Sequence, residues 1–296
     1  MTIDDLLKEF CIYKKDIEGR SDSSMNLYIK NIKEFCNAME INDYNTLINT
    51  QAETIKKWVI ELADKGNGAT TRNNKLTSIK QLFLFLEDEK DIQVDRHINK
   101  IKFAKTPIKE NKYATREIME QLIAETTNQL VKAGIVIICT TGVRFSELLQ
   151  ITCSDIEKGS ATIVGKGNKE RTIYFSPECI NISKKFINNK RKKIVESKNI
   201  DSDLLFISKD GTLISQQSFA ESLKHYAKKI GLYWYDEMSP HKLRHGFATN
   251  KINEGYPLQV VRDALGHSSI STTNRYVHSN DEDVKNMMIQ ELWEER

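Results

Sequence analysis

Apolar residues recur at helical spacing through most of the chain, and this pattern changes to a strand-like one in a single region. There, two short runs rich in β-branched and aromatic residues, 161–164 and 171–175, flank a turn-rich loop at 165–170. Two such runs joined by a short glycine-containing loop are typical of a β-hairpin. The chain is therefore predicted to be mainly α, with an α+β second half that holds a small antiparallel hairpin.

The spacing also predicts how the helices divide between two domains, for which 296 residues are long enough. In the first hundred residues, helices are expected over 2–17, from Ser23 or Ser24 to Met39, over 52–63 and over 70–87. In the second half, they are expected from Thr115 and over 133–140, 145–151, 178–196, 215–230, 240–253, 257–265 and 281–293. The lysine-rich, aperiodic segment 99–112 is predicted to be a basic linker between domains 1–98 and 113–296.

Composition excludes several classes of protein. Hydrophobic residues make up 39% and charged residues 29%, as in soluble globular proteins, and no run approaches the ~20 apolar residues of a membrane span. The N-terminus carries Asp4 and Asp5 and does not resemble a signal sequence, so a cytoplasmic location is expected. The cysteines are odd in number and lack metal-ligand spacing, which argues against disulfides or a zinc site: Cys11, Cys36, Cys139, Cys153 and Cys179. The first three lie among apolar residues and are expected in the core.

The net charge of +3 is too small to indicate a nucleic-acid partner by itself, but one helix has a distinctive face. Residues 71–80 are polar and cationic and contain no acid. Their side chains are of the kinds that contact phosphates and base edges, so five residues are predicted to bind DNA: Arg72, Asn73, Asn74, Lys75 and Lys80. An ordinary solvated helix face is the alternative interpretation.

Groups suited to phosphate chemistry gather in two parts of the second half. His241 and Arg244 are three apart on a predicted helix and project from one face. Glu147 follows Arg144 at the same interval and can orient its guanidinium. Cleavage of a phosphodiester without a metal needs a nucleophile, cations near the non-bridging oxygens and an acid for the leaving oxygen. Taken singly, an Arg144–Glu147 pair is more often a surface ion pair.

Five motifs, in order, resemble those of the tyrosine recombinases, the phage integrase family. They are Thr-Gly-Val-Arg144-Phe-Ser-Glu147-Leu, the Gly-Lys166-Gly-Asn-Lys-Glu-Arg hairpin, His241-Lys-Leu-Arg244-His-Gly-Phe-Ala-Thr, Leu-Gly-His267, and Tyr276. Together with the helical first domain, the resemblance covers nearly the whole chain. It points to the compact, Xer-like members, because the first predicted helix begins almost at Met1.

The resemblance implies a role for each matching residue. Tyr276 would attack the scissile phosphate, giving a 3′-phosphotyrosyl link and a free 5′-hydroxyl. Arg144 and Arg244 would bind the non-bridging oxygens, and Glu147 would orient Arg144. A tyrosine has a pKa near ~10, so it needs a base or a cationic pocket to react at neutral pH. Neither a metal nor another cofactor is expected, because two arginines replace the usual cation.

The remaining roles involve protons. His241 and His267 would complete the phosphate pocket, with His241 a candidate for accepting the tyrosine proton. Lys166 would protonate the leaving 5′-oxygen, and Lys169, on the same loop, is the alternative acid. His245 and His278 are interpreted as supporting or structural residues. Tyr235 and Tyr256 are alternative nucleophiles, but neither has the family's spacing to His267.

The resemblance also implies partners and an assembly. The two domains would form a C-shaped clamp around double-stranded DNA that carries a specific site, and no membrane is involved. Four copies would assemble on two duplexes through the C-terminal helix, and an accessory directionality protein would be a further partner. The apolar stripe of that helix could equally pack within its own chain: Val284, Met287, Met288, Leu292 and Trp293.

The expected function is site-specific recombination of DNA, for integration or excision of a mobile element or for resolution of DNA dimers. The sequence does not choose between these roles or name the site. Two alternatives belong to other classes. A type IB topoisomerase-like enzyme would relax single duplexes, and a non-catalytic DNA-binding relative would have lost catalytic residues, whereas every position is filled in this chain.

Overall fold

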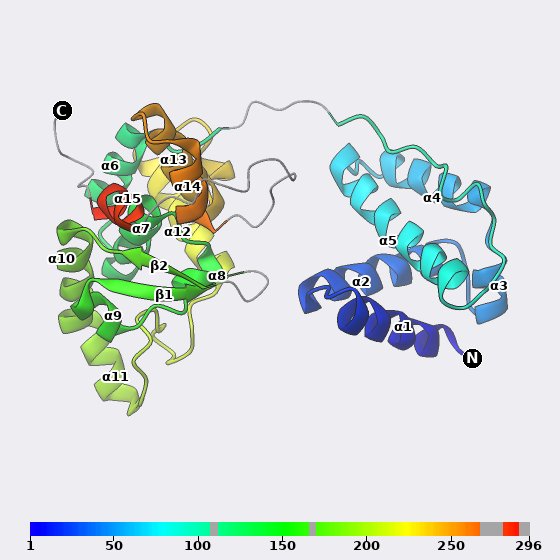
Figure 1. The fold of residues 1–296 in the computed structure, drawn as a ribbon, viewed down its shortest axis with the longest axis horizontal. Helices are drawn as coiled ribbons and strands as arrows, with labels where there is room; N and C mark the ends of the chain where they lie inside the picture. Colours follow the sequence, from blue (N-terminus) through cyan, green and yellow to red (C-terminus); the bar gives the residue numbers. More distant parts are fainter. Residues whose placement is uncertain (107–111, 166–169, 267–280, 290–296) are drawn as a thin grey trace. The chain divides into compact units, whose positions relative to one another are not determined.

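The computed structural model describes residues 1–106, 112–165, 170–266 and 281–289. The chain forms two compact units, Met1–Glu110 (unit 1) and Asn111–Arg296 (unit 2) (Figure 1). Each unit has its own apolar core. Helices dominate both units, and in the described ranges the named strands form one two-stranded antiparallel sheet. The predicted fold class, mainly α with a small β-hairpin in the second half, is confirmed.

Unit 1 is built from helices around a core that includes Phe10, Phe35 and Trp58. Its helices are α1 (Ile3–Ile12), which continues into a π-helical turn (Tyr13–Ile17), α2 (Asp22–Ala38), α3 (Tyr44–Ile48), α4 (Ala52–Asp64) and α5 (Ala69–Asp88). Helix α2 begins earlier than predicted. Ser21, not Ser23 or Ser24, is its N-cap, because the Ser21 hydroxyl accepts the Ser24 amide and so places both later serines inside the helix.

Helix α3 has no counterpart among the predicted helices. It is only one turn long, and it begins where the Asp43 carboxylate accepts the Thr46 amide and hydroxyl. Leu47 is its fully buried residue, and Tyr44 and Ile48 pack against the same core. A segment this short gives no helical period, and its signal is the capping residue alone.

The chain that follows α5 packs on unit 1 without forming a helix. Val94, Ile98 and Ile101 are buried in the unit 1 core. The Asp95 carboxylate accepts the Ala52 amide at 2.8 Å, which satisfies a free N–H at the start of α4. The packed part of unit 1 therefore extends past residue 98, at which the predicted first domain ends.

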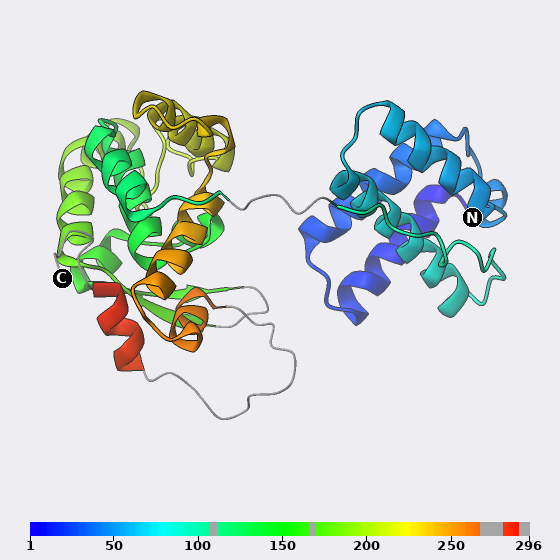
Figure 2. The ribbon, with the colours of Figure 1, turned by 90° about the horizontal axis from the view of Figure 1, so that it is seen from above.

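Unit 2 surrounds the buried helix α7 (Gln129–Thr141), which packs against helices on several sides (Figures 1 and 2). The other helices are α6 (Arg116–Glu125), α8 (Phe145–Leu148), α9 (Cys153–Lys158), α10 (Pro177–Phe186), α11 (Lys192–Lys198), α12 (Gln216–Lys229), α13 (Pro240–Asn253), α14 (Leu258–Leu265) and α15 (Asp281–Ile289). A π-helical turn (Ile187–Arg191) joins α10 to α11, and a 3-10 turn (Tyr235–Glu237) precedes α13. Gly134 lets Phe219 of α12 approach α7, since a Cβ at that position would lie 2.7 Å from the ring.

The predicted hairpin is β1 (Ser160–Val164) paired antiparallel with β2 (Glu170–Tyr174), with Ile163 opposite Arg171. Ala161, Ile163 and Ile173 are buried, so this face of the hairpin closes the core of unit 2. Helix α9 was not predicted. It has six residues, which is too short to show a helical period of apolar positions. It begins with reciprocal hydrogen bonds between Thr152 and Asp155.

Four cysteines, Cys36, Cys139, Cys153 and Cys179, are buried, and Cys11 is partly buried against the unit 1 core. The burial of Cys36 and Cys139 agrees with their interpretation as core residues, and Cys11 is only partly buried. None of the helices in the described ranges combines the length and apolar character that a membrane-spanning helix needs.

Candidate active site

A left-handed turn at Gly142 begins the site. Helix α7 ends there with φ of 66°, a conformation that favours glycine. A Cβ at this position would also overlap the Phe247 ring of α13, so both the conformation and the close packing require glycine. The turn brings Arg144 to the start of α8, with Glu147 in its first turn.

Glu147 is the centre of the site, since its side chain is only 2% exposed and three arginines surround its carboxylate. Arg144 donates from its backbone amide to Oε2 and from Nη1 to Oε1, each at 2.7 Å. Arg171 donates from Nη2 to Oε2 at 2.7 Å and from Nη1 to Oε1 at 3.1 Å. Arg244 Nη1 lies 3.6 Å from Oε2. These four residues are called the Glu147 cluster below.

The electrostatics of the cluster favour an anion. Burial alone would raise the pKa of Glu147, but hydrogen bonds from Arg171 and Arg144 and the charge of Arg171 outweigh burial and lower that pKa to about 2. The carboxylate is therefore ionised at neutral pH. Three guanidinium groups against one carboxylate leave two positive charges in excess (3 − 1 = 2). A phosphate diester carries one negative charge, which such a pocket would stabilise.

Arg244 is held more deeply than Arg144. It projects from α13 and is 5% exposed, and it donates to the Gly142 carbonyl at 2.6 Å and the Leu265 carbonyl at 2.8 Å. Burial and the neighbouring charge of Arg144 lower the pKa of Arg244 to about 10, which still leaves it cationic at neutral pH. Helix α13 is fixed in turn at Gly246, where a Cβ would overlap the Ala114 carbonyl.

The two histidines of α13 have different surroundings. His241 is exposed, one turn before Arg244 on the same helix. His245 is half-buried, and its ring centroid lies 5.6 Å from that of Tyr113. Burial, followed by the charges of His241 and Lys242, lowers the pKa of His245, so its neutral form is favoured. This position fits the structural role expected for His245.

The structure thus brings Arg144 and Glu147 to Arg244, about a hundred positions later in the chain. The other predicted site residues, Lys166, His267 and Tyr276, lie outside the described residues, as do Lys169 and His278. Their neighbours are described. Val164 and Glu170 form the last residue pair of the hairpin, and Gly266 ends α14 immediately before position 267.

Arg171 was assigned no role from the sequence, although it ends the Gly-Lys-Gly-Asn-Lys-Glu-Arg motif. It lies on β2, and its side chain is 11% exposed. The sequence holds one signal that could have identified Arg171: it is a charged residue in a short predicted strand next to the Lys166 motif. An arginine that is largely buried in such a strand needs an anionic partner.

The predicted DNA-binding face of α5 is partly engaged within unit 1. Asn73 donates from Nδ2 to the Ala104 carbonyl at 2.9 Å and accepts the Ala104 amide at Oδ1 at 2.8 Å. Lys80 donates to the carbonyls of Asn99 at 2.9 Å and Ile101 at 2.6 Å. Residues 99–104, called the exit segment below, are therefore fixed to α5.

The other three predicted DNA-binding residues differ among themselves. Lys75 pairs with Glu34 of α2, so its charge is neutralised inside the unit. Arg72 is half-buried, and Asn74 is exposed. Of the five, Arg72 and Asn74 are the ones whose side chains are not shown bonded to unit 1 in the described ranges.

Helix α15 packs on its own chain. Met287 and Met288 are buried in the unit 2 core, and the Tyr174 amide of β2 donates to Met288 Sδ at 3.5 Å. The alternative that the C-terminal stripe packs in cis therefore applies to these two residues. The side chains of Val284, Leu292 and Trp293 are not among those described.

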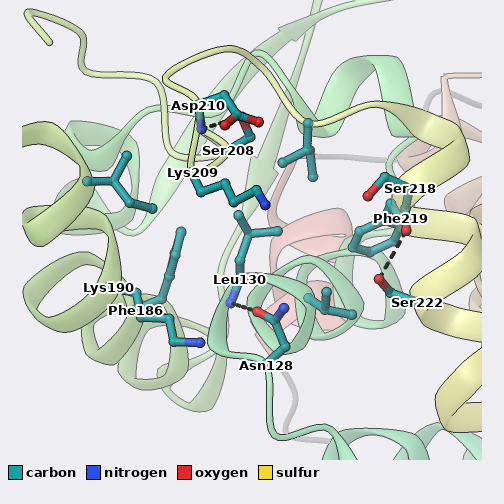
Figure 3. Close-up of a pocket in the computed structure, with 13 residues that line it drawn as sticks. Asn128, Leu130, Phe186, Lys190, Ser208, Lys209, Asp210, Ser218, Phe219 and Ser222 are labelled. Carbon is teal, nitrogen blue, oxygen red and sulfur yellow. Dashed lines mark hydrogen bonds between the residues drawn. The ribbon is translucent and has the colours of Figure 1, made fainter. Parts of the chain in front are cut away.

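A cavity of about 400 Å³ lies elsewhere in unit 2, between α12, the start of α7 and the turn after α10 (Figure 3). Several polar groups on its wall already bond to the chain: Asn128 accepts the Leu130 amide, and the Ser222 hydroxyl donates to the Ser218 carbonyl (Figure 3). No residue of the Glu147 cluster lines it. The phosphate chemistry is therefore not expected there.

Comparison with known proteins agrees with this geometry. Residues 111–283 match the model of the phage integrase family, and residues 7–90 match the phage integrase N-terminal SAM-like domain. The chain is 31% identical over 293 residues to the tyrosine recombinase XerD of Haemophilus influenzae, covering 96% of this chain and 95% of the relative.

Two solved structures share the fold. One is the XerH site-specific recombinase bound to its difH substrate, with a TM-score of 0.63, 22% identity, and coverage of 89% of this chain and 78% of that one. The other is a lambda integrase tetramer bound to a Holliday junction, with a TM-score of 0.68, 17% identity, and coverage of 94% and 80%. The chain belongs to the phage integrase family and is a site-specific tyrosine recombinase of the Xer-like type.

Proposed function

We propose that the protein binds double-stranded DNA at a specific site and exchanges strands there through Tyr276. The tyrosine oxygen forms a bond to the scissile phosphorus while the bond from phosphorus to the 5′-oxygen breaks. The 5′-hydroxyl of a second strand then attacks the 3′-phosphotyrosyl link and releases the tyrosine. Each step exchanges one phosphoester bond for another, so no ATP is required.

The Glu147 cluster is the observation that carries this proposal. Arg144 and Arg244 would bind the non-bridging oxygens, whose negative charge increases as the nucleophile attacks. Glu147 holds the Arg144 guanidinium, and the Gly142 and Leu265 carbonyls hold that of Arg244, before the DNA arrives, so little reorganisation is needed during the reaction. His241 and His267 would complete the pocket. Lys166, or Lys169 as the alternative, would protonate the leaving 5′-oxygen.

The proposal assigns DNA binding to unit 1 and catalysis to unit 2. Of the predicted linker 99–112, residues 99–104 are bonded to α5, so the linker is proposed to follow residue 104. Arg72 and Asn74 of α5 are the better candidates for contacts with DNA, because Asn73, Lys75 and Lys80 are bonded within unit 1. We also propose a cytoplasmic location, since DNA is the inferred substrate and the named relative is bacterial.

The active assembly is proposed to be a tetramer on two duplexes; the lambda integrase structure, a tetramer bound to a Holliday junction, supports the number of copies. In it, the contacts that Met287 and Met288 make with their own unit would be made with a neighbouring copy. Integration or excision of a mobile element and resolution of DNA dimers both remain compatible with this assembly, and an accessory directionality protein would select the direction.

A suicide substrate tests the nucleophile. It carries a nick a few nucleotides 3′ of the scissile phosphate, so the short fragment with the free 5′-hydroxyl diffuses away after cleavage and the covalent adduct accumulates. Tyr276→Phe should abolish the covalent protein–DNA adduct while DNA binding stays unchanged. Tyr256→Phe, which alters the alternative tyrosine, is the matched control and should form the adduct normally. An adduct formed by the Tyr276→Phe protein would refute the assignment.

A further inference from the structure

Arg171 joins three segments that are far apart in the sequence. Its guanidinium bonds to both oxygens of Glu147, as described above, and its Nε donates to the Ala264 carbonyl of α14 at 2.9 Å. Because Nε, Nη1 and Nη2 all bond to protein atoms, the planar fork has one fixed orientation. A lysine could not make this set of bonds, since it has a single nitrogen.

Each segment that Arg171 joins lies next to a residue proposed to act on the phosphate. Its own strand, β2, follows the loop that carries Lys166. Glu147 holds Arg144. Ala264 lies in the last turn of α14, three positions before His267. The side chain therefore links the hairpin, α8 and the end of α14 at one point.

The end of α14 is held by two arginines together. Arg171 binds the Ala264 carbonyl and Arg244 binds the Leu265 carbonyl. These carbonyls belong to the last turn, where a helix lacks internal partners and its dipole favours positive charge. Gly266 follows in the left-handed conformation, and a Cβ there would lie 2.9 Å from Arg171 Nη1. The direction in which the chain leaves α14 toward position 267 is thus set by arginine contacts.

We propose that Arg171 is a positioning residue for the recombination reaction. It acts through Glu147 and α14 and does not itself bind the phosphate: three of its five N–H groups, one on each nitrogen, already bond to the protein. This inference rests on the proposed function, in which Arg144 and Arg244 bind the non-bridging oxygens. Loss of Arg171 should let Glu147 and the chain before His267 adopt several arrangements, which lowers the rate of cleavage without removing a phosphate ligand.

The test measures the single-turnover rate of adduct formation on the suicide substrate with the full chain at saturating concentration. Arg171→Ala should lower this rate by roughly 100-fold, as expected for the loss of groups that orient active-site ligands. Arg171→Lys should keep the charge but lose the fork and should recover only part of the rate. DNA affinity, measured by gel shift, should change by less than about threefold, because Arg171 carries no proposed DNA contact.

A neutral substrate separates positioning from general damage. In a methylphosphonate, one non-bridging oxygen is replaced by a methyl group, so the arginines have less charge to bind. If Arg171 acts through Arg144 and Arg244, the rate difference between wild type and Arg171→Ala should shrink at least about tenfold on that substrate. An equal difference on both substrates would overturn the proposal, and so would an unchanged rate on the ordinary phosphodiester.

Arg191 provides a matched control. It is also a buried arginine of unit 2, but it bonds to the backbone carbonyls of Ser202 and Leu204, away from the Glu147 cluster. Arg191→Lys should lower thermal stability at an unchanged adduct rate below the unfolding range. If Arg171→Ala does not fold, Arg171→Lys is tested in its place; a smaller loss of rate is expected, and the same two results would overturn the proposal. Tyr276→Phe is measured in parallel. An adduct formed by that variant would refute the proposed function, whereas a normal rate for Arg171→Ala would refute only the positioning role of Arg171.

Discussion

The Glu147 cluster and the exit segment on α5 both depend on long polar side chains, yet they use them in opposite ways. In the cluster, three guanidiniums surround one buried carboxylate, and two positive charges remain for a ligand. On α5, Asn73 and Lys80 bind backbone groups of residues 99–104, and Lys75 is neutralised by Glu34. A cationic sequence pattern therefore indicates an anion site only where the charges are not already used to hold the chain together.

The largest effect should come from removing a ligand that belongs to both the protein and the phosphate. Arg244→Ala loses two buried hydrogen bonds and one proposed contact to a non-bridging oxygen. Loss of one such donor costs a rate factor of about 10²–10³ in other active sites, so a fall of about 10³ in adduct formation is expected. The rate of single-turnover cleavage measures this fall.

Lys80→Met is the corresponding change on α5. It should leave the rate per bound enzyme within about threefold of the wild-type rate. A loss of rate similar to that of Arg244→Ala would contradict the difference drawn between the two regions.

A second effect concerns acid stability. The pKa of Glu147 is about 2 in the folded protein, below its ordinary value of 4.5, so the ionised form stabilises the fold. This stabilisation is complete above about pH 4.5 and is lost as the pH falls toward 2. Glu147→Gln should be less stable than wild type at pH 7, and the difference should narrow at pH 3. Urea unfolding followed by circular dichroism at both pH values measures this difference.

If the difference in unfolding free energy between wild type and Glu147→Gln stayed constant from pH 7 to pH 3, the ion-pair account of Glu147 would be contradicted. Asp95 offers a comparison in unit 1, since backbone hydrogen bonds from Ala52 and His97 lower its pKa to about 2. Asp95→Asn removes a carboxylate that has no arginine partner. The change in its unfolding free energy between pH 7 and pH 3, compared with that of Glu147→Gln, shows how much of the acid sensitivity is specific to the Glu147 cluster.

The smallest effect is expected on α5. Asn73→Ala removes two hydrogen bonds to Ala104, and each such bond contributes about 1 kcal/mol. Amide hydrogen exchange should therefore rise in residues 99–104, with little change in the rate of adduct formation. Asn74→Ala is the matched control on the exposed face: it should leave exchange unchanged and weaken DNA binding instead. If Asn73→Ala weakened DNA binding without raising exchange, Asn73 would be a DNA contact after all.

Local patterns predicted part of this molecule. The Arg144–Glu147 pair lies within one helical turn, and the hairpin follows from strand-like runs around a glycine loop, so both were accessible from spacing. Arg171 was missed because its partner Glu147 lies 24 positions earlier in the chain, on another element. Asn73 was predicted to contact DNA from the composition of residues 71–80, and its bonds to Ala104, 31 positions away, were not predicted. Distant hydrogen bonds leave no periodic pattern in a sequence. A family motif can mark the residues that take part, as the hairpin motif that ends in Arg171 does, but it does not show their partners.

Buried thiols make the protein suitable for site-directed labelling. Burial raises the pKa of Cys36 and Cys153 to about 11 and that of Cys179 to about 12, and it also raises the pKa of Cys139. Since thiolates and not thiols react with maleimides, these four cysteines should stay unmodified in the folded protein. With Cys11 changed to Ser, one introduced surface cysteine in each unit would carry a pair of fluorophores. Energy transfer between them would then measure the distance between the two labels with and without DNA.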